Sequence, residues 1–120
     1  LGDGSYSFDI VGEASYQYNL RQICGPRKEE GEDRKEVALL IFEDPNPYDD
    51  YQAVCVKIQG MTVGYMDKEF ARSFQERIKK ENIPINRADL ACYAVIRGGW
   101  DREGEKGQYR VWLDILDLEE

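Results

Sequence analysis

The sequence contains no histidine and only three cysteines among its 120 residues. Without histidine, Ser-His-Asp and Cys-His catalytic arrangements are excluded, and the commonest zinc ligand is missing. The cysteines, Cys24, Cys55 and Cys92, are scattered among apolar residues and have no CxxC spacing. This usage is typical of buried, reduced thiols in an intracellular protein. We therefore expect a binding domain rather than an enzyme, with no catalytic residue, metal site or cofactor.

Long apolar runs and an excess of basic residues are also missing. No segment reaches the ~18 uninterrupted apolar residues that a membrane span needs, so we expect no membrane partner. The 16 Lys and Arg stand against 24 Asp and Glu, which gives a formal net charge of -8. A field of this sign repels phosphate, so any nucleic-acid binding must depend on a local basic patch.

The length of 120 residues fits one domain, spanning residues 1–120. The sequence begins at Leu1 without a basic, apolar leader, which we interpret as a fragment of a longer protein. Its host protein would then determine where the domain acts.

Two short elements are predicted before residue 26. The segment 5–11 alternates apolar and polar residues, which is typical of a half-buried strand ending at Gly12. The segment 15–24 has helical spacing, with Ser15 as N-cap and Gly25 as the stop. The apolar face of this helix consists of Tyr16, Leu20 and Ile23.

The middle of the chain predicts a loop followed by three strands. Residues 26–36 include no apolar residue and indicate a solvated loop. The continuous apolar run 37–42 is typical of a strand covered on both faces, and the β-branched segment 53–58 predicts its neighbour. Residues 61–66 predict a further strand.

The main helix is predicted over residues 67–81, with Asp67 as its N-cap. Three residues at helical spacing, Phe70, Phe74 and Ile78, form one apolar stripe that we assign to the core.

The end of the chain predicts a long hairpin, because strands over 88–99 and 108–116 flank a charged, glycine-rich connection. Trp112 lies on the opposite face of the last strand from its apolar row, either covered by the N-terminal helix or exposed. The apolar row consists of Tyr109, Val111, Leu113 and Ile115.

This order of elements predicts an α+β fold. Six short strands with mostly hairpin-length connections favour a small, strongly curved, mostly antiparallel sheet or partly open barrel, and two helices complete it.

The segment "DPNPYDDYQAV", residues 44–54, combines turn-forming residues with carboxylates and a tyrosine. Asn46, Pro47, Tyr48 and Asp49 fit a type I turn, in which Asp49 simply hydrogen-bonds the turn backbone. The same residues also fit one wall of a binding site. Both interpretations remain open from the residues alone.

Three segments together resemble the HIRAN domain family. They are "DIVGEASYQ", "EVALLIFEDPNPYDDYQAVCV" and "GMTVGYMDKEFA", and the resemblance covers roughly residues 8 to 80. It implies an OB-like β-barrel that occurs alone or fused to helicases and nucleases. It also implies binding to the 3′ end of single-stranded DNA, as an accessory to DNA repair or processing. A helicase or nuclease domain in the same chain or complex is the implied partner.

The resemblance also implies site residues, because the family's end-binding pocket matches five positions. These are Tyr48 and Asp49 of the NPYD motif, Lys68 entering the main helix, Tyr65 and Tyr16. Arg72 lies one turn beyond Lys68 and completes the candidate set.

This chain departs from the family pattern at several positions. The family usually reads NPYDxNA, whereas here Asp50, Tyr51 and Gln52 precede Ala53, which adds one residue and replaces the asparagine. Ala14 and Ser15 stand where a DNA-binding member has arginine and tyrosine, and Asp67 replaces a residue that is often basic. One phosphate contact and one stacking ring are therefore missing, so we expect weak, micromolar binding.

The chemistry of the matched residues fits a DNA end. A tyrosine face stacks on any unpaired base, and a carboxylate such as Asp49 favours a terminal hydroxyl over a terminal phosphate. Lys68 at a helix N-terminus is placed to bind the last phosphate. The alternative interpretation is that Lys68 is an ordinary solvated lysine on a helix surface and that Tyr16 is a core residue of its helix. A protein–protein interaction module without DNA binding is the alternative function, and an acidic mimic of DNA is a third.

Overall fold

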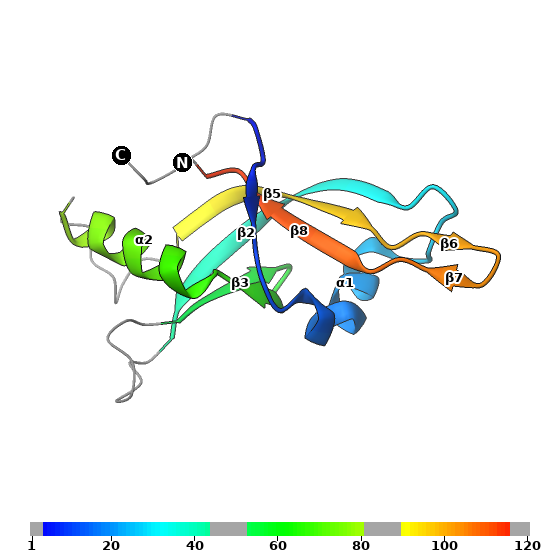
Figure 1. Ribbon diagram of the computed structural model, residues 1–120, viewed down its shortest axis with the longest axis horizontal. Helices are drawn as coiled ribbons and strands as arrows, with labels where there is room; N and C mark the ends of the chain where they lie inside the picture. The colour runs from blue at the N-terminus through cyan, green and yellow to red at the C-terminus, as the bar shows by residue number, and fades with distance from the viewer. Residues whose placement is uncertain (1–3, 44–52, 81–89, 116–120) are drawn as a thin grey trace.

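The computed structural model describes residues 4–43, 53–80 and 90–115. Figure 1 shows an elongated molecule in which a curved sheet carries one helix at one end and the other beneath its middle, while a β-projection forms the opposite end. In chain order the elements are β1 (Phe8–Asp9), η1 (Glu13–Tyr16), α1 (Gln17–Cys24), β2 (Glu32–Phe42), β3 (Val54–Ile58), β4 (Met61–Tyr65), α2 (Lys68–Lys80), β5 (Leu90–Gly98), β6 (Asp101–Arg102), β7 (Glu105–Lys106) and β8 (Tyr109–Leu113), where η1 is a 3₁₀-helix.

The main sheet has six strands in the order β1-β8-β5-β2-β3-β4, and every neighbouring pair is antiparallel. The sheet curls until its two edges meet. Just after β1, Val11 forms a bridge with Tyr65 at the end of β4, and each residue donates its backbone N–H to the other's carbonyl at 2.9 Å. We call this closure the seam. The fold is therefore the predicted α+β type, a small, strongly curved OB-like barrel with two helices.

Gly64 allows the two edges to approach at the seam. A Cβ atom at this position would lie 2.7 Å from Ile10 Cδ1 and 2.8 Å from the carbonyl oxygen of Val11. Nearby, the pairing of β3 with β4 shifts register between Val56 and Lys57. Such a bulge bends its strand sharply, which helps β4 to curl toward the N-terminal segment.

The predicted apolar row of the last strand is confirmed as core. Its members Tyr109, Val111, Leu113 and Ile115 are all buried. At the other end of the barrel, Phe74 of α2 is 3% exposed and its ring stacks on those of Phe42 and Phe70. The third residue of the predicted stripe, Ile78, has a side chain outside the part that the structure describes.

The N-cap of α2 is also confirmed. Asp67 Oδ1 accepts the backbone N–H of Glu69 at 3.1 Å, and the Asp67 carbonyl accepts that of Ala71 at 2.8 Å. These bonds satisfy amides that a helix start leaves without partners.

The predicted N-cap of the first helix, Ser15, is wrong. Ser15 lies inside η1, where its backbone N–H donates to the Gly12 carbonyl at 3.1 Å, and α1 continues directly from that turn. Gly12 has a φ of 84°, a left-handed conformation that starts the turn earlier than the cap pattern indicated. The buried face of Leu20 and Ile23 and the stop at Gly25 are confirmed.

The predicted solvated loop over residues 26–36 is also wrong in its second half. Residues 32–36 belong to β2 and pair with residues 94–98 of β5. Together with β6 and β7 they form a projection that we call the β-arm, residues 28–36 and 97–108 (Figure 1). The arm's strands form through cross-strand pairing without apolar side chains of their own, so no alternation of apolar and polar residues marks them in the sequence.

The expectation that residues 37–42 are covered on both faces is wrong. Val37 is 51% exposed and Leu39 36% exposed, whereas Ala38 and Leu40 are fully buried. The first predicted strand is shorter than expected, with only Phe8–Asp9 in β1. Trp112 is partly buried, and the guanidinium groups of Arg97 and Arg110 lie over its ring. All three cysteines are buried and form no disulfide, as predicted.

Candidate nucleic-acid interface

Two of the predicted site residues, Tyr16 and Tyr65, come together at the seam. Tyr16 ends η1 and Tyr65 ends β4, and their ring centroids lie 6.3 Å apart with the planes inclined by 46°. Both side chains are partly exposed. This tilted pair, which we call the tyrosine pair, presents aromatic surface to a ligand at the point where the sheet closes.

The position of Tyr16 depends on Glu13, the first residue of η1. Glu13 is 6% exposed, and its Oε2 accepts the backbone N–H of Val111 at 3.2 Å and lies 3.4 Å from Arg110 Nε. Gln17 holds the next turn to the same strand, since its side chain both donates to and accepts from the backbone of Tyr109. Side-chain bonds therefore fix η1 against β8.

The hydroxyl of Tyr65 donates a hydrogen bond to Glu43 Oε2 at 2.9 Å. This bond is the main reason that the pKa of Tyr65 lies well above its ordinary value, and partial burial adds to the shift. The hydroxyl therefore stays protonated, and its bond to Glu43 holds the ring in one orientation. Sequence analysis missed Glu43, because one glutamate among 24 acidic residues gave no distinguishing signal.

The described residues on either side of the motif-bearing segment 44–52 lie near Tyr65. Glu43 donates its backbone N–H to the carbonyl of Ala53 at 2.9 Å, and Met66 donates to the carbonyl of Val54 at 3.0 Å. Glu43, Ala53 and Val54 are thus held next to the end of β4. Tyr48 and Asp49 themselves lie outside the described residues.

Lys68 and Arg72 lie on the first two turns of α2 and are both exposed. Lys68 follows Tyr65 closely in the chain, which places its backbone at the same end of the barrel. The carboxylate of Asp67 already caps the helix. Its negative charge opposes the attraction of the helix N-terminus for a phosphate, so the two basic side chains must supply that attraction.

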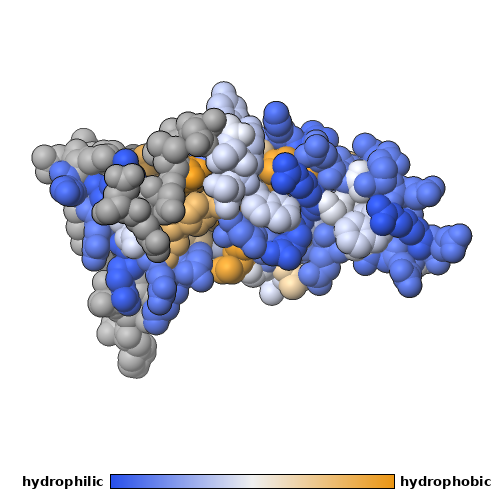
Figure 2. Space-filling model, turned by 45° about the horizontal axis from the view of Figure 1, so that its top comes forward, coloured by the Kyte–Doolittle hydropathy of each residue, from blue (hydrophilic) through white to orange (hydrophobic). Residues whose placement is uncertain are grey.

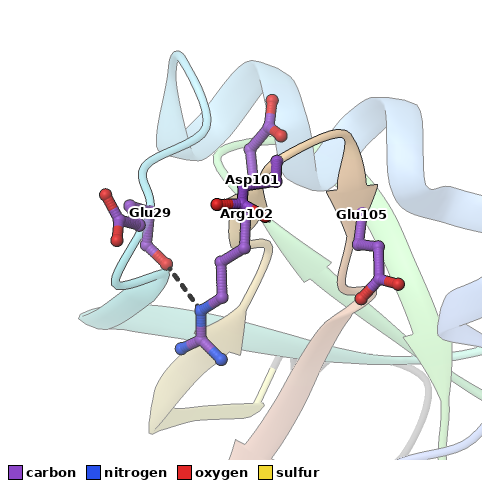
Figure 3. A pocket seen from close by; sticks show the side chains of 5 residues that line it. Glu29, Asp101, Arg102 and Glu105 are labelled. Atoms are coloured by element: carbon purple, nitrogen blue, oxygen red, sulfur yellow. Dashed lines mark hydrogen bonds between the residues drawn. The ribbon is translucent and has the colours of Figure 1, made fainter.

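A separate cavity of about 420 Å³ lies in the β-arm and is shown in Figure 3. It is lined by Glu29, Asp101, Arg102, Glu103 and Glu105. Arg102 is turned toward the backbone, where its Nε donates to the Glu29 carbonyl at 3.0 Å. The cavity has four carboxylates and one arginine, so it repels phosphate. The outer end of the arm is hydrophilic on the face shown in Figure 2.

Across the described ranges, no group of three or more His, Cys, Asp or Glu side chains could hold a metal ion. The described helices also include none that is both long and apolar enough to cross a membrane. No family model, curated protein or solved structure matches this chain.

Proposed function

We propose that this domain binds the 3′ end of single-stranded DNA at the tyrosine pair, as an accessory to DNA repair or processing. In this role it would serve a helicase or nuclease domain in the same chain or complex. The proposal rests on one observation above the others, which is that Tyr16 of η1 and Tyr65 at the end of β4 meet at the seam, where both rings are partly exposed. Such tyrosines form a stacking platform that accepts any base.

The bond between Tyr65 and Glu43 supports this role through preorganisation. A ring held in place before the ligand arrives loses little rotational freedom on binding, so more of the stacking free energy appears as affinity. The carboxylate also supplies selectivity, because its negative charge repels a terminal 3′-phosphate more than a terminal hydroxyl. Asp49 would add to the same preference.

The phosphate of the terminal nucleotide is assigned to Lys68 and Arg72 on α2. Two cations give a modest salt dependence, and the nearby carboxylates weaken the contact further. Micromolar affinity at low salt is therefore the expected range.

The proposal is tested by titrating labelled oligonucleotides with either a 3′-hydroxyl or a 3′-phosphate, at low and at physiological salt. Tyr65→Leu should weaken binding by roughly 1–3 kcal/mol at both salt concentrations, whereas Tyr65→Phe should keep the stacking term. Tyr18→Leu is the matched control, because Tyr18 is 70% exposed on α1 and belongs to no part of the proposed site.

Charge variants test the rest of the site. Lys68→Ala should weaken binding and flatten its salt dependence, and Asp67→Asn should strengthen binding while keeping the helix cap. Tyr48→Ala should lose stacking, and Asp49→Asn should narrow the preference for a 3′-hydroxyl. If the wild-type domain binds no oligonucleotide at low salt, or if the Tyr65 and Lys68 variants bind like wild type, the proposal fails.

The proposed role includes no catalytic step, metal or cofactor. Purified domain supplied with divalent metal ions should leave labelled single-stranded and duplex DNA intact. Reproducible cleavage that a single Asp or Glu substitution abolishes would contradict this expectation.

The alternative function, protein binding, is favoured by a different surface. Val37 and Tyr93 are directly opposite each other on β2 and β5 and are 51% and 62% exposed. A shallow cavity of about 350 Å³ lies beside them, lined also by Tyr6 and Lys35. Binding to an isolated partner that Tyr93→Ser abolishes and Tyr65→Leu leaves intact would favour this alternative.

A further inference from the structure

A line of outward-facing residues leads from the tyrosine pair across the barrel to Trp112. Val11 pairs with Tyr65, and Asp9, two residues earlier on the same face, pairs with Trp112. Trp112 in turn pairs with Val95 of β5. Figure 1 shows β1 next to the end of β8, with which it pairs. The tyrosine pair and Trp112 therefore share one face, with only the N-terminal strand between them.

Two arginines meet above Trp112. Arg97 and Arg110 are directly opposite each other on β5 and β8, and their guanidinium carbons lie 5.5 Å and 5.6 Å from the Trp112 ring centroid. Like charges placed opposite each other repel in a sheet, and here each arginine has a carboxylate partner that offsets the repulsion. Stacked guanidinium groups and an indole are also the surfaces on which unpaired bases stack.

Asp33 and Asp9, the acidic partners of Arg97 and Arg110 on this face, are surface groups, whereas the buried Glu13 also lies 3.4 Å from Arg110 Nε. Arg97 Nε lies 3.3 Å from Asp33 and Arg110 Nη2 lies 2.8 Å from Asp9, and both arginine side chains are about half exposed, at 50% and 48%. Exposed ion pairs of this kind contribute little stability. A phosphate group can therefore compete with Asp33 for Arg97 and with Asp9 for Arg110 without breaking the contact between Arg110 and Glu13.

We propose that Arg97, Trp112 and Arg110 form a second stacking subsite for the nucleotides that precede the bound 3′ end. This inference rests on the proposed function and extends it from recognition of an end to recognition of a strand of defined minimum length. With one intervening strand and a two-residue offset, the Cα atoms of Tyr65 and Trp112 lie ~12 Å apart by ordinary sheet spacing. At ~3.4 Å per stacked nucleotide, this distance corresponds to about three nucleotides.

The test measures affinity against length, using oligothymidylates with a free 3′-hydroxyl. The wild-type domain should bind a pentanucleotide about tenfold more tightly than a dinucleotide. Trp112→Leu should remove this gain and leave dinucleotide binding unchanged. Trp100→Phe is the matched control, because Trp100 also lies beneath an arginine, Arg102, but belongs to the β-arm.

A second measurement avoids changing Trp112 at all. In the Trp100→Phe variant Trp112 is the remaining tryptophan, so the intrinsic fluorescence reports on the subsite alone. Pentathymidylate should quench it, whereas a saturating dinucleotide should not.

The outcomes separate the two proposals. If dinucleotides and pentanucleotides bind equally and Trp112 fluorescence is unchanged at saturation, the second subsite is overturned while end binding stands. If Trp112→Leu binds the pentanucleotide like wild type, the subsite is overturned in the same way. If no oligonucleotide of any length binds, the proposed function itself fails and the subsite fails with it.

Discussion

The barrel and the β-arm are built from the same strands but are held together differently. In the barrel, β2 and β5 bury side chains such as Leu40 and Ala94. In the arm, the same two strands pair through charged residues such as Asp33 and Arg97, which bridge to each other at 3.3 Å. One region is stabilised by apolar burial and the other by backbone pairing.

The arm still has two packed contacts, and both depend on glycine. A Cβ atom at Gly99 would lie within 2.5 Å of three Tyr109 ring atoms, and one at Gly107 would overlap the ring of Trp100. Each aromatic ring therefore lies directly against backbone. The comparison teaches that a charged segment without a core of its own can hold regular strands when an aromatic side chain packs on a neighbouring glycine.

The largest expected effect is in the barrel, at Phe74. Phe74→Ala should lower the free energy of unfolding by roughly 3–5 kcal/mol, because it removes a buried ring that stacks on Phe42 and Phe70. Urea denaturation measures the change. Arg102→Ala in the arm is the comparison variant and should cost about 0.5 kcal/mol or less. If Phe74→Ala hardly changed the free energy of unfolding, α2 would not belong to the core and the comparison between barrel and arm would fail.

The next effect is at the seam. Gly64→Ala should cost about 1–3 kcal/mol, because the added methyl group meets the Val11 carbonyl and the Ile10 side chain at under 3 Å. It should also weaken oligonucleotide binding, since it displaces Tyr65. Gly60→Asn is the control, because Gly60 has a φ of 78° that asparagine tolerates and open space around it. Equal stability of Gly64→Ala and wild type would show that the edges do not close as described.

Two buried thiols, one in the barrel and one beside the arm, predict that stability depends on pH. Burial raises the pKa of Cys92, within the barrel sheet, to about 12, and that of Cys24, beside the charged arm, to about 11, from an ordinary value of 9.0. The unfolded chain therefore ionises first. The stability that the protonated thiols contribute is complete below pH 9.0 and is lost as pH rises through about 11 and then 12.

Urea denaturation between neutral pH and pH 11 measures this loss. The Cys24→Ala/Cys92→Ala double variant is the control and should show a weaker pH dependence. If the free energy of unfolding fell equally with pH in wild type and in the double variant, the thiols would be accessible in the folded protein.

The smallest expected effect is in the arm. Arg34→Ala removes a pair in which Arg34 Nε lies 2.6 Å from Glu36 Oε2, yet both groups are partly exposed and the pair should contribute only about 0–1 kcal/mol. Hydrogen exchange should show faster opening of residues 32–36 than of residues 38–42. A loss comparable to that of Phe74→Ala would place the arm's charges among the main stabilising interactions.

The sequence predicted the elements in which burial of one face requires apolar residues at a regular spacing. The apolar row of β8, the stripe of α2 and the cap at Asp67 each combine a spacing with a defined partner, and each is confirmed for the residues described. The charged half of β2 was missed because cross-strand pairing requires no particular side chain. The exposure of Val37 and Leu39 was missed because an apolar run does not state how many of its faces are covered.

The candidate site could be predicted only in part for a similar reason. Motif positions identified Tyr16 and Tyr65, and the structure brings them together, whereas the role of Glu43 follows from its hydrogen bond with the Tyr65 hydroxyl. The arginines over Trp112 lie far from any motif. Only strand register, which sequence pattern does not fix, places them on the same face as the tyrosine pair.

The seam has a consequence for how this protein is made. The N-terminal segment must pair both with β8, which follows the other described strands in the chain, and with β4, and the backbone N–H of Gly4 bonds to the side chain of Asp114 at 2.9 Å. During translation the first strand therefore has no complete binding site until about one hundred further residues have left the ribosome. Both sheet edges stay open over that interval, so we expect the nascent chain to be most prone to aggregation just before β8 emerges.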